Sequence, residues 1–216
     1  MFLKELTGEE SLEYIRVTGA IREGHFVLTS GRHSPNYVNK DDVSTLPHRL
    51  DVLAYTIERA FKGRGVQVVA APAVGAIALG NRVAYHFGGD VIAVFAESDG
   101  DDFVFRRDYA RFIKPRVKVL LVEDIVTTGK TTWAMIRVVE ALGGEVVGVG
   151  LLRNRSQEEF PVPVFACVNR AFPTYDPIEC LLCKESVPIS TEVGHGHAFL
   201  TEFGEDPAGW PANKGK

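Results

Sequence analysis

Short apolar runs alternate with longer helix-like stretches through the middle of the chain. The apolar runs have few polar positions, as in strands that are covered on both faces: they are residues 66–71, 91–95, 117–122 and 146–152. The stretches with helical spacing of apolar positions are residues 46–62, 77–87 and 131–142. This alternation predicts an α/β fold with a mostly parallel sheet flanked by helices.

The first 40 residues have a different pattern. Residues 9–20 have loosely helical spacing, and a Gly/Ser/Pro-rich turn separates two short β-prone runs, 26–28 and 37–39. We expect a short helix followed by a hairpin. From residue 202 onward few side chains can be buried, which is typical of a flexible tail.

Composition excludes some classes of protein. With 24 Lys and Arg against 28 Asp and Glu, the net charge of −4 does not favour nucleic acid or a membrane surface as a partner. The longest nearly apolar run, residues 68–80, is shorter than the roughly 20 residues of a membrane-spanning helix. Without a signal-peptide pattern at the start, and with an odd number of cysteines, 3, we expect a soluble cytoplasmic protein.

One strand end carries most of the candidate chemistry. Glu123 and Asp124 follow the run 117–122, and the hydroxyl- and glycine-rich segment 127–132 then opens a helix. Ligands of parallel sheets bind at the carboxyl ends of strands, and a helix N-terminus binds phosphate. The pattern favours a phosphorylated polyol. A nucleoside-triphosphate loop is excluded because it needs glycine five positions before Gly129. The alternative is a helix capped by Thr127 and Thr128 beside a solvated acidic pair.

Two segments resemble a known family. Residues 119–131, Val-Leu-Leu-Val-Glu-Asp-Ile-Val-Thr-Thr-Gly-Lys-Thr, resemble the phosphoribosyl-diphosphate (PRPP) motif of type I phosphoribosyltransferases. Residues 24–39 are similar to the N-terminal hairpin of the orotate phosphoribosyltransferase branch. The resemblance implies the type I fold, as one domain over residues 1–200, with a small hood from about residues 20–40 and C-terminal segments, before a tail over 201–216.

The resemblance also implies an activity and a cofactor. A homodimer would transfer the 5-phosphoribosyl group from PRPP to orotate with Mg²⁺, giving orotidine 5′-monophosphate and pyrophosphate. Glu123 and Asp124 would bind the ribose hydroxyls and stabilise positive charge at C1. The other implied substrate-binding residues lie in a phosphate loop (Thr127, Thr128, Gly129, Lys130, Thr131), a pyrophosphate loop (Ala73, Gly75) and the hairpin (Ser30, Arg32, Ser34, Tyr37).

Arg155 matches the family position whose guanidinium can bind the orotate carboxylate in bidentate fashion. Spacing alone does not separate it from Arg153. A surface ion pair of Arg155 with Glu158 or Glu159 is the structural alternative.

Three features depart from the family pattern. Thr29 and Gly75 stand where the family commonly has lysine, and the lid segment 97–111 lacks the usual lysines and histidine. We therefore expect Arg106 and Arg107 to neutralise pyrophosphate, with a solvated arginine pair as the alternative. The departures leave two other functions open: transfer to another base, and a non-catalytic regulator that senses PRPP or a nucleotide.

A zinc site is a further hypothesis. Cys180 and Cys183, with His195 and His197 downstream, offer four ligands at a spacing suited to structural zinc. The remaining histidines are scattered, and we expect them at the surface or in hydrogen-bonded structural positions: His25, His33, His48 and His86.

Overall fold

The computed structural model describes residues 3–39, 41–170 and 172–204. These residues divide into two compact units, one within Met1–Tyr14 and Val43–Arg170 and the other within Ile15–Asp42 and Ala171–Lys216. The elements follow in the order α1 (Gly8–Val17), β1 (Ile21–Val27), β2 (His33–Val38), α2 (Asp41–Ser44), α3 (Pro47–Phe61), β3 (Val68–Pro72), α4 (Ile77–Phe87), β4 (Ile92–Asp99), β5 (Asp102–Val104), η1 (Tyr109–Phe112), β6 (Lys118–Val126), α5 (Lys130–Ala141), β7 (Glu145–Asn154), β8 (Val164–Val168), η2 (Pro177–Glu179), α6 (Leu181–Lys184) and α7 (Gly196–Phe203).

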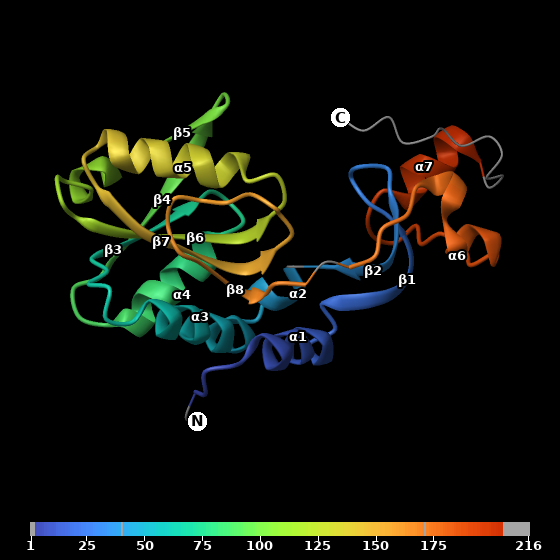
Figure 1. The fold of residues 1–216 in the computed structure, drawn as a ribbon, viewed down its shortest axis with the longest axis horizontal. Coiled ribbons are helices and arrows are strands. Elements are labelled where there is room, and N and C mark those ends of the chain that lie inside the picture. Colours follow the sequence, from blue (N-terminus) through green and yellow to red (C-terminus); the bar gives the residue numbers. More distant parts are fainter. Residues whose placement is uncertain (1–2, 40, 171, 205–216) are drawn as a thin grey trace. The chain divides into compact units, whose positions relative to one another are not determined.

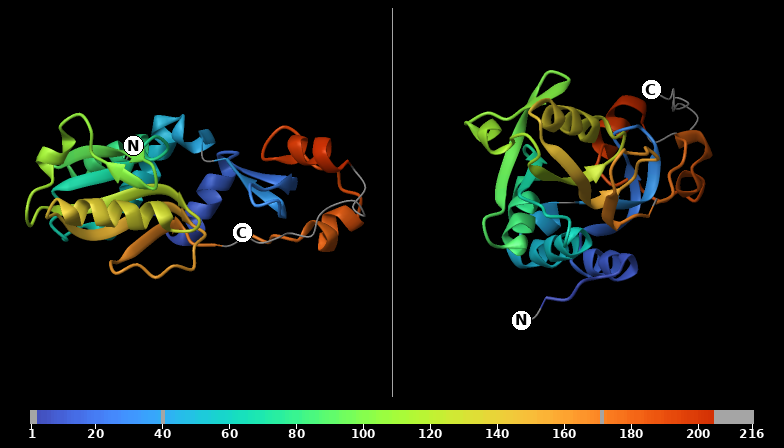
Figure 2. Two further views of the ribbon diagram at one scale, coloured as in Figure 1. Left: turned by 90° about the horizontal axis from the view of Figure 1, so that it is seen from above. Right: turned by 60° about the vertical axis from the view of Figure 1, so that its left-hand side comes forward.

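The first unit is built on a six-stranded sheet in the order β5-β4-β3-β6-β7-β8. Every neighbouring pair is parallel except β4 and β5. Helices α3 and α4 cover one face and α5 covers the other (Figure 1 and Figure 2). The predicted α/β fold is confirmed. The connection through α4 leads from β3 to β4 and that through α5 from β6 to β7, so the topological switch point lies between the adjacent strands β3 and β6.

Along strand β7, glycines face α3 and larger apolar residues face α5. A Cβ atom added at Gly148 would lie 2.2 Å from the Phe61 ring, and one at Gly150 would lie 2.4 Å from Ile57, so only glycine lets α3 approach this closely. The alternate residues Val149 and Leu151 are buried in the cluster under α5. The glycines therefore fix the packing distance of α3.

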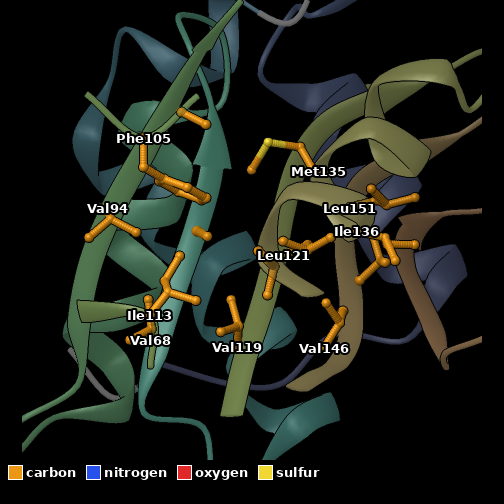
Figure 3. Close-up of a cluster of buried hydrophobic side chains, with 14 of the residues drawn as sticks. Val68, Val94, Phe105, Ile113, Val119, Leu121, Met135, Ile136, Val146 and Leu151 are labelled. Atoms are coloured by element: carbon orange, nitrogen blue, oxygen red, sulfur yellow. The ribbon is translucent and has the colours of Figure 1, made fainter. Parts of the chain in front are cut away.

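The apolar cluster under α5 is drawn in Figure 3. Strands contribute residues such as Val119 and Leu121, and α5 contributes Met135, Ile136 and Val139, all buried. Burying such side chains contributes about 1.5–3 kcal/mol each. This cluster holds α5, and with it the loop that precedes α5, firmly against the sheet.

The strands are longer than their apolar runs. The predicted strand 117–122 continues as β6 to Val126, and the predicted strand 146–152 continues as β7 to Asn154. The two extensions pair with each other, Ile125 opposite Arg153 and Val126 opposite Asn154. Charged residues inside a strand break the apolar pattern without breaking the backbone ladder, and the predicted ends were therefore too early. The short β5 and the edge strand β8 were not predicted.

The second unit contains the β1–β2 hairpin together with η2, α6 and α7. Its strands are longer than the predicted runs 26–28 and 37–39, and His33 forms an antiparallel bridge with Tyr175. Residues 20–39, within the predicted hood, belong to this unit, as do the C-terminal segments. The predicted tail 201–216 begins inside α7, and its residues 205–216 lie outside the described part of the chain. Among the described helices, none has the length and apolar character needed to cross a membrane.

Candidate functional site

Three predicted segments follow neighbouring strands of the sheet. The loop 73–76 follows β3, the loop 127–129 follows β6, and Arg155 follows β7, and these strands are adjacent and parallel. Their carboxyl ends therefore lie at one edge, at the topological switch point where α/β proteins bind ligands.

Glu123 lies within β6 and is fixed by α5. The residue is 9% exposed, and its Oε2 atom accepts a 2.7 Å hydrogen bond from the Thr132 hydroxyl. Thr132 lies in the first turn of α5 and is itself buried. The bond ties the carboxylate to the first turn of α5, directly after the loop 127–129. The sequence analysis did not single out Thr132, although its place nine residues after Glu123, at the start of a helix, is a signal that could have found it.

Asp124 points to the opposite face of the sheet from Glu123, because side chains alternate along a strand. It is 8% exposed, and its Oδ1 atom accepts a 2.6 Å hydrogen bond from the Ile125 backbone N–H. Two consecutive carboxylates can therefore be buried without facing each other. Each offers oxygen atoms in a different direction at the end of β6.

The loop before α5 has the geometry of an anion site. Thr127, Thr128 and Lys130 are exposed, and Gly129 has a φ of 76°, in the left-handed region that favours glycine. Gly129 occupies the N-cap position, so the backbone N–H groups of the first turn lie at the positive end of the helix dipole. Hydroxyls, a lysine and helix N–H groups converge on this loop.

A second segment covers Gly129 on one side. An added Cβ at Gly129 would lie 3.0 Å from side-chain atoms of both Glu158 and Phe160. The Trp133 indole N–H donates a 3.4 Å hydrogen bond to Glu158 Oε2, and its ring packs against Phe160 with centroids 5.4 Å apart. The loop after β7 thus packs against the loop 127–129 and the first turn of α5.

The predicted pyrophosphate loop connects β3 to α4. The Ala73 N–H donates a 2.7 Å bond to Ala96 O, the peptide bond between Ala73 and Val74 is cis, and Val74 and Gly75 are exposed. Gly80 in α4 approaches β3 closely, since a Cβ there would lie 2.9 Å from the Ala71 Cβ. This loop presents backbone to the carboxyl edge.

The two arginines after Leu152 differ in environment. Arg153 lies within β7, is 6% exposed and donates from Nη2 to Arg170 O at 3.4 Å. Burial, together with repulsion from Arg155, lowers the pKa of the Arg153 guanidinium to about 10. Arg155 is exposed, and its backbone N–H donates to Val126 O at 2.9 Å, beside the end of β6. In the described ranges, Arg155 forms no ion pair with Glu158 or Glu159.

The lid arginines pair with acidic residues of their own hairpin. Arg106 Nη2 lies 3.2 Å from Asp99 Oδ1 and its Nε lies 3.7 Å from Glu97, while Arg107 Nε lies 3.5 Å from Glu97. Both guanidinium groups are more than half exposed. Such pairs are weak in water, so the arginines can exchange them for a more highly charged anion.

The hairpin residues named above are engaged within the second unit. Arg32 donates from Nε to Thr174 Oγ1 at 3.0 Å and from Nη2 to Thr174 O at 2.9 Å, and the Ser34 hydroxyl donates to Pro173 O at 2.9 Å. Ser30 is exposed, and the Tyr37 ring packs against Phe26. Arg32 and Ser34 thus hold the hairpin to the segment 173–175.

The cysteine pair has other histidine neighbours than the sequence analysis expected. Cys180 and Cys183 lie with His25 and His33, whereas His195 and His197 are exposed at the start of α7. His195 Nε2 lies 3.2 Å from Thr29 Oγ1. Burial lowers the pKa of His33 to about 4, aided by repulsion from His25.

A cavity of about 410 Å³ lies elsewhere, at the amino-terminal edge of the sheet. It is lined by residues that precede or begin β3, β4 and β6, among them Gln67, Asp90 and Lys114. No predicted site residue lines it. Since ligands of parallel sheets bind at the opposite edge, we assign this cavity no role in the chemistry.

Comparison with known proteins gives matches along most of the chain. Residues 42–172 match the family "Phosphoribosyl transferase domain". The orotate phosphoribosyltransferase of Caldanaerobacter subterraneus subsp. tengcongensis is 38% identical over 183 residues, which cover 84% of this chain and 94% of that protein. In a search of solved structures, the orotate phosphoribosyltransferase of Francisella tularensis has a TM-score of 0.56 at 21% identity, with 73% of this chain and 84% of that chain covered. The adenine phosphoribosyltransferase of Rhodothermus marinus has a TM-score of 0.56 at 24% identity, covering 73% and 97%. The structural matches, under 25% identical, bear on the fold alone.

Proposed function

The chain belongs to the phosphoribosyltransferase family, and we propose that it transfers the 5-phosphoribosyl group of PRPP to orotate. The observation that carries this is the arrangement at the end of β6: a buried acidic pair is followed by an exposed hydroxyl loop and a helix N-terminus. The 38% identity with an orotate phosphoribosyltransferase supports orotate as the base.

In this reaction the orotate ring nitrogen forms a bond to C1 of the ribose and gives up its proton, to water or to the departing pyrophosphate, as the bond from C1 to pyrophosphate breaks. Positive charge develops at C1. The Asp124 carboxylate and that of Glu123 hold the ribose hydroxyls and stabilise this charge, while residues 127–131 hold the 5-phosphate. Pyrophosphate departs with the electron pair of the bond that joined it to C1. Catalysis therefore depends mainly on positioning the reactants and on stabilising the charges that develop.

Mg²⁺ is part of the proposal. The carboxylates of Glu123 and Asp124 are oxygen donors of the kind that this ion prefers, so the residues at this edge fit it, although most of its ligands would come from PRPP. Bound with PRPP, the ion would neutralise charge on the departing pyrophosphate.

The remaining positive charge comes from arginines and backbone. Arg155 binds the orotate carboxylate, and Arg106 and Arg107 leave Glu97 and Asp99 to bind pyrophosphate when the lid closes. Ala73 and Gly75 contribute backbone groups to pyrophosphate binding. For Ser30, Arg32, Ser34 and Tyr37 of the hairpin, the family resemblance alone supports a role in substrate binding. Assembly as a homodimer and a cytoplasmic location complete the proposal, and light scattering of the purified protein tests the dimer.

The decisive experiment measures turnover of PRPP in the presence of Mg²⁺ with a panel of bases, namely orotate, uracil, adenine and hypoxanthine. The rate of pyrophosphate release is the readout. We expect orotate alone to be used efficiently. Turnover of a purine instead would reassign the base. PRPP binding without turnover of any base would favour the regulator.

A further inference from the structure

Four side chains that bind metals converge inside the second unit. They are His25, His33, Cys180 and Cys183, and their ligand atoms all lie within 4.8 Å of one another. His25 belongs to β1 and His33 to the start of β2, whereas Cys180 is the N-cap residue of α6 and Cys183 lies within that helix. We propose that these four side chains bind one structural zinc ion.

Three of the sulfur–nitrogen distances fit a tetrahedral site. With Zn–S bonds of about 2.3 Å and Zn–N bonds of about 2.0–2.1 Å, sulfur and nitrogen ligands lie about 3.5 Å apart. Cys180 Sγ lies 3.7 Å from His25 Nε2, and Cys183 Sγ lies 3.6 Å from the same atom and 3.3 Å from His33 Nδ1. His25 Nε2 and His33 Nδ1 are 2.8 Å apart, about 0.5 Å closer than in such a site, so the rings separate slightly on binding.

A hydrogen bond orients the first ligand. His25 Nδ1 lies 2.7 Å from Val187 O. A carbonyl oxygen only accepts, so Nδ1 carries the proton, and the lone pair of Nε2 faces the cluster. Bonding of the outer ring nitrogen to a carbonyl is the usual way in which proteins fix a zinc-binding histidine.

The ligand set favours zinc in a structural role. Two sulfurs and two imidazole nitrogens in a tetrahedral arrangement suit zinc, and the C-x₂-C spacing of Cys180 and Cys183 is typical of such sites. His25, His33 and Cys180 are each no more than 1% exposed. Four protein ligands and this burial leave no open position for a substrate.

The second unit has a physical need for such a link. One described apolar cluster of this unit has Val27 and Phe199 buried, with Cys183, Ile189 and Phe203 partly buried against them, and β1 also buries Ile21 and Phe26. Units of this small size are commonly stabilised by metals or disulfides in addition to their core. His25 and Cys183 are 158 positions apart, so one ion would join the hairpin to the C-terminal segment.

The test begins with the wild-type chain produced in zinc-supplemented medium. Elemental analysis of the dialysed protein should find about one zinc ion per chain. Single variants Cys180→Ser and Cys183→Ser should each lose at least about 90% of it, whereas the double variant His195→Ala/His197→Ala and the variant Cys167→Ser should retain it. These controls separate the proposed ligands from the exposed histidines and from the remaining buried cysteine.

Cobalt substitution tests the wild type without relying on variants that could misfold. Refolding with Co²⁺ should give the intense visible bands of a tetrahedral ion and a thiolate charge-transfer band in the near ultraviolet. Wild-type protein with neither zinc nor these bands would overturn the proposal. The cluster would then be a hydrogen-bonded chain that runs from His33 through His25 to the Val187 carbonyl. Zinc kept by both cysteine variants would overturn it equally.

Discussion

The Thr132 hydroxyl and Glu123 Oε2, both buried, are joined by a 2.7 Å hydrogen bond that links the acidic end of β6 to the first turn of α5. Replacing Thr132 with valine keeps the shape and removes the donor. We expect Thr132→Val to lower the free energy of unfolding by about 1–3 kcal/mol, because a buried carboxylate loses this partner. Urea unfolding measures this. Thr132→Ser should restore most of the loss, and equal stability of all three proteins would contradict the role.

Asp124 supports charge at C1 in the proposed reaction. Asp124→Asn keeps the size of the side chain and removes its negative charge, so kcat should fall by roughly a hundredfold or more while the thermal unfolding temperature changes little. Steady-state kinetics with PRPP and orotate measure kcat. Unchanged turnover would remove Asp124 from the mechanism.

Arg155 distinguishes orotate from bases without a carboxylate. Arg155→Ala should lower kcat/KM for orotate by roughly a hundredfold, because a partly desolvated carboxylate loses its guanidinium partner. The KM for PRPP should change little. Arg153→Ala is the matched variant: Arg153 is buried against Arg170 O, so its loss should reduce stability more than orotate selectivity. If Arg155→Ala uses orotate normally, another group binds the carboxylate.

Arg106 and Arg107 should act through exposed charge. Changing both to alanine should raise the KM for PRPP, and the difference from wild type should shrink as salt concentration rises, because salt screens exposed charges. Arg137→Ala is a control, since Arg137 pairs with Asp102 of the same hairpin but lies on α5. An identical KM for PRPP in the double variant and the wild type at low salt would show that Arg106 and Arg107 are a solvated pair that does not bind PRPP.

Asp51 makes stability depend on pH. Burial raises its pKa, but hydrogen bonds from Arg82 and His86 outweigh burial, so the pKa of Asp51 lies below its ordinary value. Its stabilising contribution is therefore present above the ordinary pKa and is lost as pH falls through the lowered one. Asp51→Asn should cost about 1 kcal/mol at pH 7, and the gap to wild type should close in strong acid. Urea unfolding at several pH values checks this, and a gap that persists in strong acid would exclude the ion pair as its cause.

Much of the first unit followed from periodicity alone. The helix 77–87 was predicted with the bounds of α4, and the α/β fold was predicted from apolar runs that are buried on both faces. Local pattern is enough there because each parallel strand must be apolar wherever helices cover it. The loop between β6 and α5 was equally predictable, since a strand, an acidic pair and a Thr/Gly helix start are contiguous in sequence.

Residues distant in sequence were decided by tertiary structure. Which strand lies beside β3 depends on the crossover connections, so only the strand order shows that the loops after β3, β6 and β7 meet at one edge. The extension of β6 past Glu123 required pairing with β7 and a partner on α5.

The cysteine and histidine cluster shows the limit most clearly. Sequence spacing identified Cys180 and Cys183 but joined them to His195 and His197, because those histidines are near in the chain. The fold instead brings His25 and His33 to the cysteines from more than 140 residues away. Composition and periodicity determine which side chains are available and which faces are buried. Only the path of the backbone decides which of them meet, because contact depends on distance in space and a hairpin closed against a C-terminal segment leaves no periodic trace in the sequence.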